Sequence, residues 1–161
     1  MIYSIHNGIS PMPISRKVKR RLLGVLSQRG IHGKVFELGA GWGSLAFPLA
    51  QKLPRCPVLA YENSLIPYLF SRCRKLLFPY ENLTLNRGNF YHISLAEADI
   101  VVCYLYPGAM VRLQAKFERE LKRETLVISS TFAVPAWKPR QIIEVDDLYH
   151  TKIYVYIAQQ H

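Results

Sequence analysis

The strongest constraint on the fold lies in residues 35–47, which read VFELGAGWGSLAF. The stretch begins as a short apolar run typical of a buried strand, passes through three glycines at alternate positions, and continues as an apolar run of helical character. Glycine adopts left-handed backbone conformations and carries no side chain, so a ligand can approach the main chain closely at such a turn. The stretch therefore predicts a strand–loop–helix unit with a ligand-binding loop.

The rest of the chain repeats this strand-then-helix pattern. A first helix is expected over 15–30, with Ser15 as its N-cap and Gly30 as its stop. We then expect strands over 34–38, 56–63, 83–90, 98–107, 125–132, 141–148 and 152–159, and helices over 43–53, 64–77 and 107–123. The alternation predicts one α/β domain over residues 1–161: a doubly wound, Rossmann-like seven-stranded sheet, mostly parallel, with a C-terminal antiparallel hairpin.

The composition limits the class of protein to which the chain can belong and the kinds of partner that it can bind. Half of the 161 residues are hydrophobic, as in a globular domain. The three cysteines have no CxxC spacing, so we expect reduced thiols, no metal site and a cytoplasmic location. The chain shows neither an apolar run of about 18 residues nor a signal-peptide pattern, so no membrane-spanning helix is expected. The net charge of +10 favours RNA, an anionic membrane surface or an acidic protein as partner, without choosing among them.

The spacing of the glycines restricts the ligand of the loop. A dinucleotide-binding G-x-G-x-x-G motif needs a glycine three places after Gly41, where this chain has Ser44. A P-loop needs Gly-Lys-Ser/Thr, which is absent. The remaining pattern is Glu37-x-Gly39-x-Gly41-x-Gly43. About 20 residues beyond the loop, Glu62 ends a predicted strand, where a carboxylate can accept hydrogen bonds from both hydroxyls of a ribose.

Together these residues resemble a class I, seven-strand S-adenosylmethionine-dependent methyltransferase. The resemblance implies S-adenosyl-L-methionine as cofactor, with its methionyl part over the loop and its amino group near the acidic residue that heads it. The residues implied are Glu37, Gly39, Ala40, Gly41 and Gly43 for the methionyl part, Glu62 and Asn63 for the ribose, and Asn89 and Phe90 for the adenine. Asparagine can pair with N6 and N1 of adenine; the alternative is that Asn89 is only a turn residue.

Aromatic residues mark the expected position of the acceptor. Methyl transfer from a sulfonium requires alignment more than acid–base chemistry. Tyr104 and Tyr106 follow the fourth strand and Trp137 follows the fifth, so all three are expected at the carboxyl edge of the sheet as catalytic residues. Aromatic faces can hold a lysine stem or a methylammonium by cation–π attraction. The alternative is that each is an ordinary core or lid aromatic.

Three further segments, PMPISRKVKRRLL, CYLYPGAMVRLQAKFERELKRETLVIS and FAVPAWKP, resemble one subgroup. They are similar to the protein-lysine methyltransferase family that includes the mitochondrial ATP synthase c-subunit lysine methyltransferase and its shorter prokaryotic relatives. This implies a protein lysine as acceptor and an irregular N-terminal segment, 1–13, that covers the cofactor and brings Pro13 and Ser15 near it. An RNA methyltransferase and a non-catalytic binding module remain alternatives, and the oligomeric state is not predicted.

Overall fold

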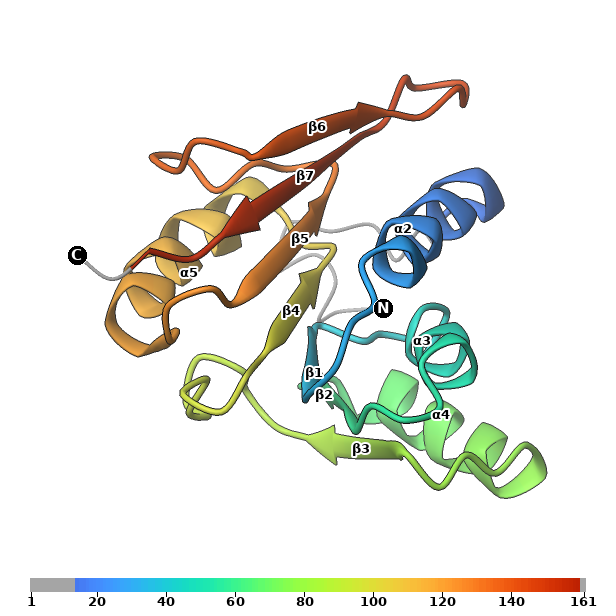
Figure 1. Cartoon of the computed structure of the whole chain (residues 1–161). Helices are drawn as coiled ribbons and strands as arrows, with labels where there is room; N and C mark the ends of the chain where they lie inside the picture. Colours follow the sequence, from blue (N-terminus) through green and yellow to red (C-terminus); the bar gives the residue numbers. More distant parts are fainter. Residues whose placement is uncertain (1–13, 160–161) are drawn as a thin grey trace.

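The computed structural model describes residues 14–159, which form a single seven-stranded sheet flanked by helices (Figure 1). The elements are α2 (Arg16–Gln28), β1 (Val35–Leu38), α3 (Ala46–Lys52), β2 (Val58–Glu62), α4 (Leu65–Leu77), β3 (Leu83–Arg87), β4 (Ile100–Cys103), α5 (Pro107–Glu120), β5 (Leu126–Ser130), β6 (Gln141–Glu144) and β7 (Lys152–Ile157). The strand order is β3-β2-β1-β4-β5-β7-β6, and β7 runs antiparallel to both β5 and β6. The predicted fold class is confirmed.

The two faces of the sheet are covered differently. Figure 1 shows α2, α3 and α4 on one side and α5 on the other. The short central strands β1 and β4 are buried along their whole length, as expected where parallel strands are covered on both faces. Val35 and Ile100 pack toward α2 and α3, whereas Phe36 and Val101 pack toward α5. The non-helical segment 88–99 completes the α5 side.

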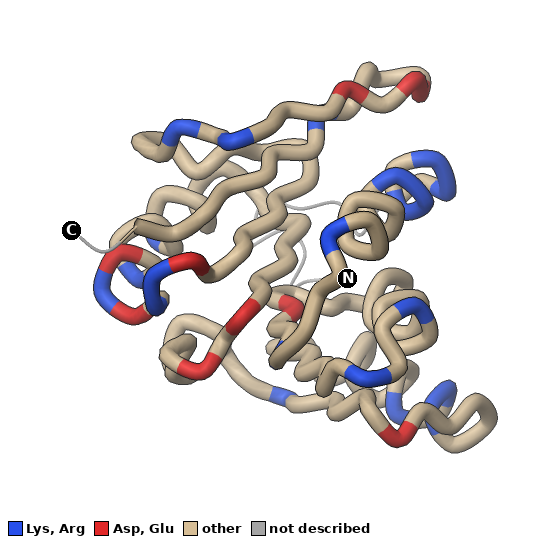
Figure 2. The backbone as a smooth tube through the Cα atoms, viewed as in Figure 1, with Lys and Arg blue, Asp and Glu red and all other residues tan. Residues whose placement is uncertain are grey.

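The first helix of the described chain follows its sequence signals closely. The Ser15 hydroxyl accepts a hydrogen bond of 3.2 Å from the Val18 amide, which makes Ser15 the N-cap. Val18, Leu22 and other apolar residues at helical spacing are buried, and Gly30 adopts a left-handed φ of +58° just past the C-cap. The predicted helix over 15–30 is therefore confirmed, and its lysines and arginines lie along the outside of the molecule (Figure 2).

Two helix boundaries differ from the predictions. Helix α3 begins at Ala46 rather than Gly43, because Gly43 has a left-handed φ of +74° and its amide closes a turn onto the Ala40 carbonyl. Helix α5 ends at Glu120 rather than Arg123, because Leu121 already has the extended ψ of 133°. None of the helices within residues 14–159 is long and apolar enough to cross a membrane.

We predict that Asn82 is a stability determinant. Its side-chain amide donates to three main-chain carbonyls. They are that of Ala50 within α3, at 3.0 Å, and those of Leu53 and Cys56 just after α3, at 3.0 and 3.1 Å. Asn82→Ala removes the side-chain donor of these buried carbonyls, of which Leu53 keeps only the Cys56 amide, and should lower the free energy of unfolding by about 1–3 kcal/mol, measured by urea denaturation. The control Gln51→Ala removes an exposed amide from α3 and should change it by less than about 0.5 kcal/mol; equal losses would contradict this role.

Candidate functional site

The glycine loop is fixed to the end of β2 by main-chain hydrogen bonds. The amides of Gly39 and Ala40 both donate to the Tyr61 carbonyl at 2.9 Å. Gly39, Gly41 and Gly43 all have positive φ, at +79°, +54° and +74°. The loop is therefore a defined left-handed turn at the carboxyl edge of the sheet, and the alternate glycines of the motif are the residues that such a turn requires.

The three glycines serve different purposes. A Cβ atom at Gly39 would lie 2.6 Å from Leu105 Cδ2, and one at Gly43 would lie 2.8 Å from the Phe47 ring. A Cβ at Gly41 would meet nothing within 4 Å. Gly39 and Gly43 are thus needed for packing within the protein, whereas Gly41 faces open space. Gly41 is the position at which a ligand can contact the bare main chain.

Glu62 links this loop to the following helix. One carboxylate oxygen accepts a hydrogen bond from the Gly41 amide at 2.7 Å, and the other accepts one from the Ser64 amide at 2.7 Å. Each oxygen keeps a second lone pair, so the carboxylate can still accept hydrogen bonds from a diol. The neighbouring Asn63 is exposed. The structure therefore places Glu62 against the loop, as the sequence predicts.

Glu37 is the most unusual group of the site. Its side chain is only 4% exposed, and its Oε2 atom is buried without a hydrogen-bond partner among residues 14–159. Burial, with a smaller contribution from the nearby charge of Glu62, raises the pKa of Glu37 to about 8. A buried acceptor without a partner is costly, and a cationic amino group would supply both the missing donors and the missing charge. The residues present therefore fit the amino-acid end of S-adenosylmethionine.

The pleat of the sheet places three predicted site residues on one face. Glu37 pairs in register with Ala60 of β2 and with Val102 of β4. Two residues further along each neighbouring strand come Glu62 and Tyr104, and residues two apart point to the same face. Glu37, Glu62 and Tyr104 thus meet at the carboxyl edge, on the side covered by α2 and α3.

The adenine candidates lie on segment 88–99. The Asn89 side-chain oxygen accepts a hydrogen bond from the Tyr91 amide at 2.9 Å, so Asn89 does close a turn. Its amide nitrogen makes no hydrogen bond within residues 14–159 and can donate to a ring nitrogen. The Phe90 ring comes within 3.9 Å of the Cβ position of Gly39, so Phe90 lies beside the loop.

Trp137 does not join the other predicted residues. Its ring packs on Phe117 and Tyr156, with centroid separations of 5.8 and 6.0 Å, and its indole N–H donates to Glu118 at 3.2 Å. Helix α5 begins at the carboxyl edge and runs back across the sheet, so Glu118, near its end, lies far from the loop. The structure assigns Trp137 to packing between α5 and β7.

Tyr106, one of the predicted catalytic residues, lies on the α5 side in a tyrosine pair that was not predicted. It is the N-cap residue of α5 and neighbours Tyr91, whose hydroxyl is buried and has no partner within hydrogen-bond distance among residues 14–159. Burial, chiefly, raises the pKa of Tyr91 to about 12, although the Arg112 guanidinium lies 3.7 Å from the ring centroid. Tyr91 and Arg112 are 21 positions apart in the sequence and meet only in the folded chain, so no sequence pattern indicates them.

The remaining predictions concern the N-terminal side. Lys19 Nζ reaches the Ser44 carbonyl at 3.4 Å, which places the first turns of α2 beside the loop. The Ser15 hydroxyl caps α2, and Pro13 lies outside the described residues. In the described part of the chain, no three His, Cys, Asp or Glu side chains form a cluster that could hold a metal ion.

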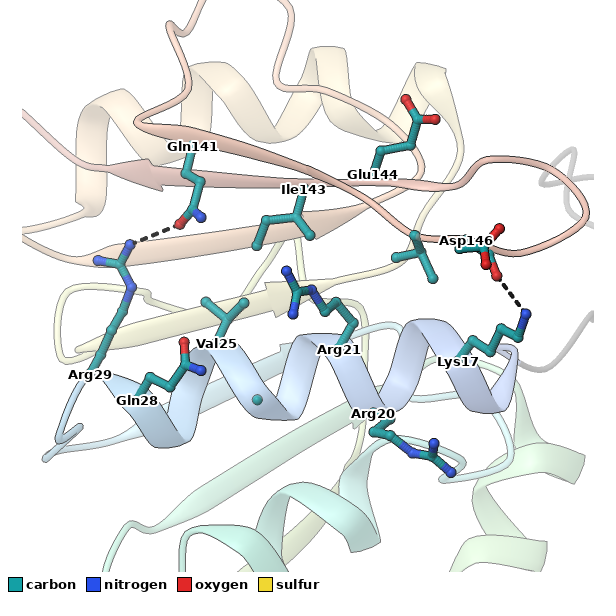
Figure 3. Close-up of a pocket in the computed structure, with 12 residues that line it drawn as sticks. Lys17, Arg20, Arg21, Val25, Gln28, Arg29, Gln141, Ile143, Glu144 and Asp146 are labelled. Carbon is teal, nitrogen blue, oxygen red and sulfur yellow. Dashed lines mark hydrogen bonds between the residues drawn. The ribbon is translucent and has the colours of Figure 1, made fainter.

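A separate groove of about 700 Å³ runs between α2 and β6 (Figure 3). Lys17 Nζ donates to the Asp146 carbonyl at 2.6 Å, and the Arg29 guanidinium donates to the Gln141 side chain at 3.4 Å. None of the predicted site residues lines this groove. Part of the basic face of α2 is therefore used within the protein itself, in contacts with β6 and the residues that follow it.

We predict that Glu37 makes the unliganded protein less stable as the pH rises. Its pKa of about 8 in the folded chain exceeds the ordinary value of 4.5, so the folded chain binds more protons than the unfolded chain between these values. This contribution to stability is fully present below about pH 4.5 and is lost as the pH approaches about 8. Glu37→Gln should remove this decline in urea unfolding between about pH 5 and pH 9; an identical decline in both proteins would contradict it.

Comparison with known proteins agrees with this geometry. The ANTKMT methyltransferase domain matches residues 37–141 of the chain. A protein-lysine N-methyltransferase of Saccharolobus islandicus (strain REY15A) is 30% identical over 171 aligned residues, which cover 100% of this chain and 99% of that protein. The adenine nucleotide translocase lysine N-methyltransferase of Mus musculus is 29% identical over 128 residues, which are 77% of this chain and 55% of that protein.

Solved structures share the fold at lower identity. An RNA methyltransferase from Salinibacter ruber, in complex with S-adenosyl-L-homocysteine, superposes with a TM-score of 0.78 at 20% identity, covering 91% of this chain and 93% of that one. Magnesium protoporphyrin IX methyltransferase from Synechocystis PCC 6803 gives 0.69 at 17% identity, covering 88% of this chain and 78% of that one. Fold, site geometry and sequence agree, and the chain belongs to the ANTKMT methyltransferase domain family.

Proposed function

We propose that this chain transfers a methyl group from S-adenosylmethionine to the side-chain amine of a protein lysine. The observation that carries the cofactor assignment is the pair of carboxylates around Gly41. Glu37 is buried with an unpartnered oxygen, and Glu62 fixes the one glycine of the loop that faces open space. We infer lysine as the methyl acceptor from the two relatives, both of which are lysine N-methyltransferases.

Each part of the cofactor has a fitting group in the chain. Glu37 would hold the amino group, the main chain at Gly41 would lie against the methionyl part, and Glu62 would accept hydrogen bonds from the ribose hydroxyls. Phe90 and the Asn89 amide would contact the adenine. When bound, the cofactor would supply an electrophilic methyl group: the neutral amine would form a bond to the methyl carbon as the carbon–sulfur bond breaks, leaving the neutral thioether S-adenosylhomocysteine.

The remaining task of the protein is to align the acceptor amine. Tyr104 lies on the same face as the two carboxylates, and its ring can pack along the alkyl stem of a lysine. The Tyr91 pKa of about 12 keeps that phenol neutral at physiological pH, so Tyr91 can offer a hydrogen bond but not a base. Tyr91 therefore does not take the proton of the lysine amine in this proposal. Such a site needs alignment above all.

The direct test is methylation of defined acceptors with a labelled methyl donor. Purified protein is incubated with tritiated S-adenosylmethionine and, in parallel, with basic protein and with RNA from the source cells. The proposal expects label that resists nuclease, is lost on proteolysis and maps by mass spectrometry to lysine. Nuclease-sensitive label would instead establish the RNA methyltransferase, and cofactor binding without transfer to either acceptor would establish the binding module.

We predict that Gly41→Arg abolishes binding of S-adenosylmethionine, because the new side chain would occupy the open space above the loop. The matched control is Gly30→Arg, since Gly30 has nearly the same left-handed φ, +58° against +54°, and also has nothing within 4 Å of its Cβ position. Both variants carry the same backbone strain, of about 1–2 kcal/mol. Calorimetry should detect binding only in the control; undiminished affinity in Gly41→Arg would exclude this loop as the cofactor site.

A second prediction separates the aromatic candidates. Tyr104→Ala removes a ring beside the carboxylates and should lower kcat/KM for a protein acceptor by about tenfold or more, equivalent to about 1.4 kcal/mol. Trp137→Phe should lower only the stability, because Trp137 packs on α5 and β7. Methyl transfer per folded molecule is compared after the folded fraction is measured by circular dichroism. A larger catalytic loss in Trp137→Phe than in Tyr104→Ala would reverse the assignment.

A further inference from the structure

Helix α4 is oriented with its apolar side away from the sheet. Its only fully buried residue is Ser71, at 2% exposure, whose hydroxyl donates to the Gly41 carbonyl at 3.3 Å. The aliphatic and aromatic residues that an amphipathic helix normally directs into the core instead face outward. These outward residues, which we call the α4 apolar face, are Leu65, Ile66, Leu69, Phe70, Cys73, Leu76 and Leu77.

The α4 apolar face is a continuous stripe. At 100° per residue these seven positions fall within an arc of about 140° on the helix, centred almost opposite Ser71. Leu76 and Leu77 are 82% and 76% exposed, and Phe78, just past the helix, extends the stripe. The middle of the stripe contacts the glycine loop, because the Trp42 ring packs edge-on against Phe70 at a centroid distance of 5.3 Å. Exposed apolar stripes of this extent mark a binding surface.

The charge around this stripe is predominantly positive. Between Gly39 and Glu81 the chain has five cations and two acidic residues. Lys52, Arg55 and Arg72 are exposed, whereas Arg74 lies over the Phe47 ring and Lys75 donates to the Leu83 carbonyl, so these two point toward the sheet side. Both oxygens of Glu62 accept main-chain hydrogen bonds at the loop, and Glu81 is exposed beyond Phe78. The excess of exposed cations complements an anionic partner.

The shape of the surface helps to identify that partner. Helix α4 lies outermost on its side of the molecule, against β2 and the edge strand β3 (Figure 1). A helix with Leu, Ile and Phe on its outer side and the exposed Arg72 beside them has the composition of helices that lie in the interface of an anionic bilayer. RNA offers little to aliphatic side chains. A second copy of this chain would bring two sets of cations together.

We propose that the α4 apolar face docks on an anionic membrane surface, with the helix lying along the interface and the exposed Arg72 near the lipid headgroups. The proposal is independent of the methyl acceptor. It predicts a peripheral association that needs both anionic lipid and the exposed side chains of α4. It also predicts that salt weakens binding, because part of the attraction is electrostatic.

The test is sedimentation of the full chain with vesicles. Vesicles of equal parts phosphatidylglycerol and phosphatidylcholine should bind it at least about tenfold more strongly than pure phosphatidylcholine. The double variant Leu76→Gln, Leu77→Gln should weaken binding to the anionic vesicles by about tenfold or more. The control, Val111→Gln with Leu148→Gln, removes similarly exposed apolar side chains from α5 and the β6–β7 connection and should bind as wild type.

Three outcomes would overturn the proposal. They are equal binding to neutral and anionic vesicles, no loss in the α4 variant, and equal losses in the α4 variant and the control. Sedimentation velocity is run on the same proteins without lipid, and self-association that the α4 variant abolishes, with no vesicle binding, would assign the face to a second copy of the chain. Calorimetric binding of S-adenosylmethionine confirms that each variant is folded, so failure of the proposed catalysis leaves this test unaffected.

Discussion

The carboxylate of Glu62 holds together the elements on which the site depends. One oxygen accepts a hydrogen bond from the glycine loop after β1, and the other accepts one from the first turn before α4. Among the described residues the Gly41 amide has no main-chain acceptor, unlike those of Gly39, Ala40 and Gly43, so the Glu62 carboxylate supplies the partner that this amide needs. Glu62 thereby sets the position of Gly41, and the Ser71 hydroxyl of α4 fixes the same residue from its carbonyl side.

The second carboxylate of the site, Glu37, lowers the stability of the folded protein. Glu37 lies on β1, where every residue is buried, and it has no partner for one oxygen. A hydrophobic residue at this position of a central parallel strand would stabilise the sheet more. The raised pKa of Glu37, about 8, has the same cause: burial without a neighbouring cation favours the neutral carboxylic acid over the carboxylate. A strand that keeps such a residue is organised for a positively charged ligand.

Much of this was predictable from sequence because it depends on local chemistry. Gly39, Gly41 and Gly43 indicate left-handed turns wherever they occur in this spacing, and Glu62 ends a strand whose neighbour is the loop. Trp137 lies away from the loop because residues 134–137 turn along α5, where Gln114 and Glu118 bind them. The pairing of Tyr91 with Tyr106 and Arg112 joins residues far apart in the sequence, and no local pattern indicates that they meet. Predictions failed where tertiary contacts, and not the local pattern, decide the direction of a segment.

Helix α4 shows the same limit most clearly. Its apolar spacing predicts a helix correctly, and the usual inference from such spacing is that the apolar side faces the core. In the structure the apolar side of α4 faces outward instead. The side next to the sheet is occupied by Ser71, the partly buried Tyr68 and the stem of Lys75, and the Lys75 amine donates to the Leu83 carbonyl. These contacts satisfy the sheet side with polar groups, so little apolar surface of α4 is buried within the chain. The α4 apolar face thus stays exposed among residues 14–159, and it lies on the helix that Glu62 and Ser71 attach to the glycine loop.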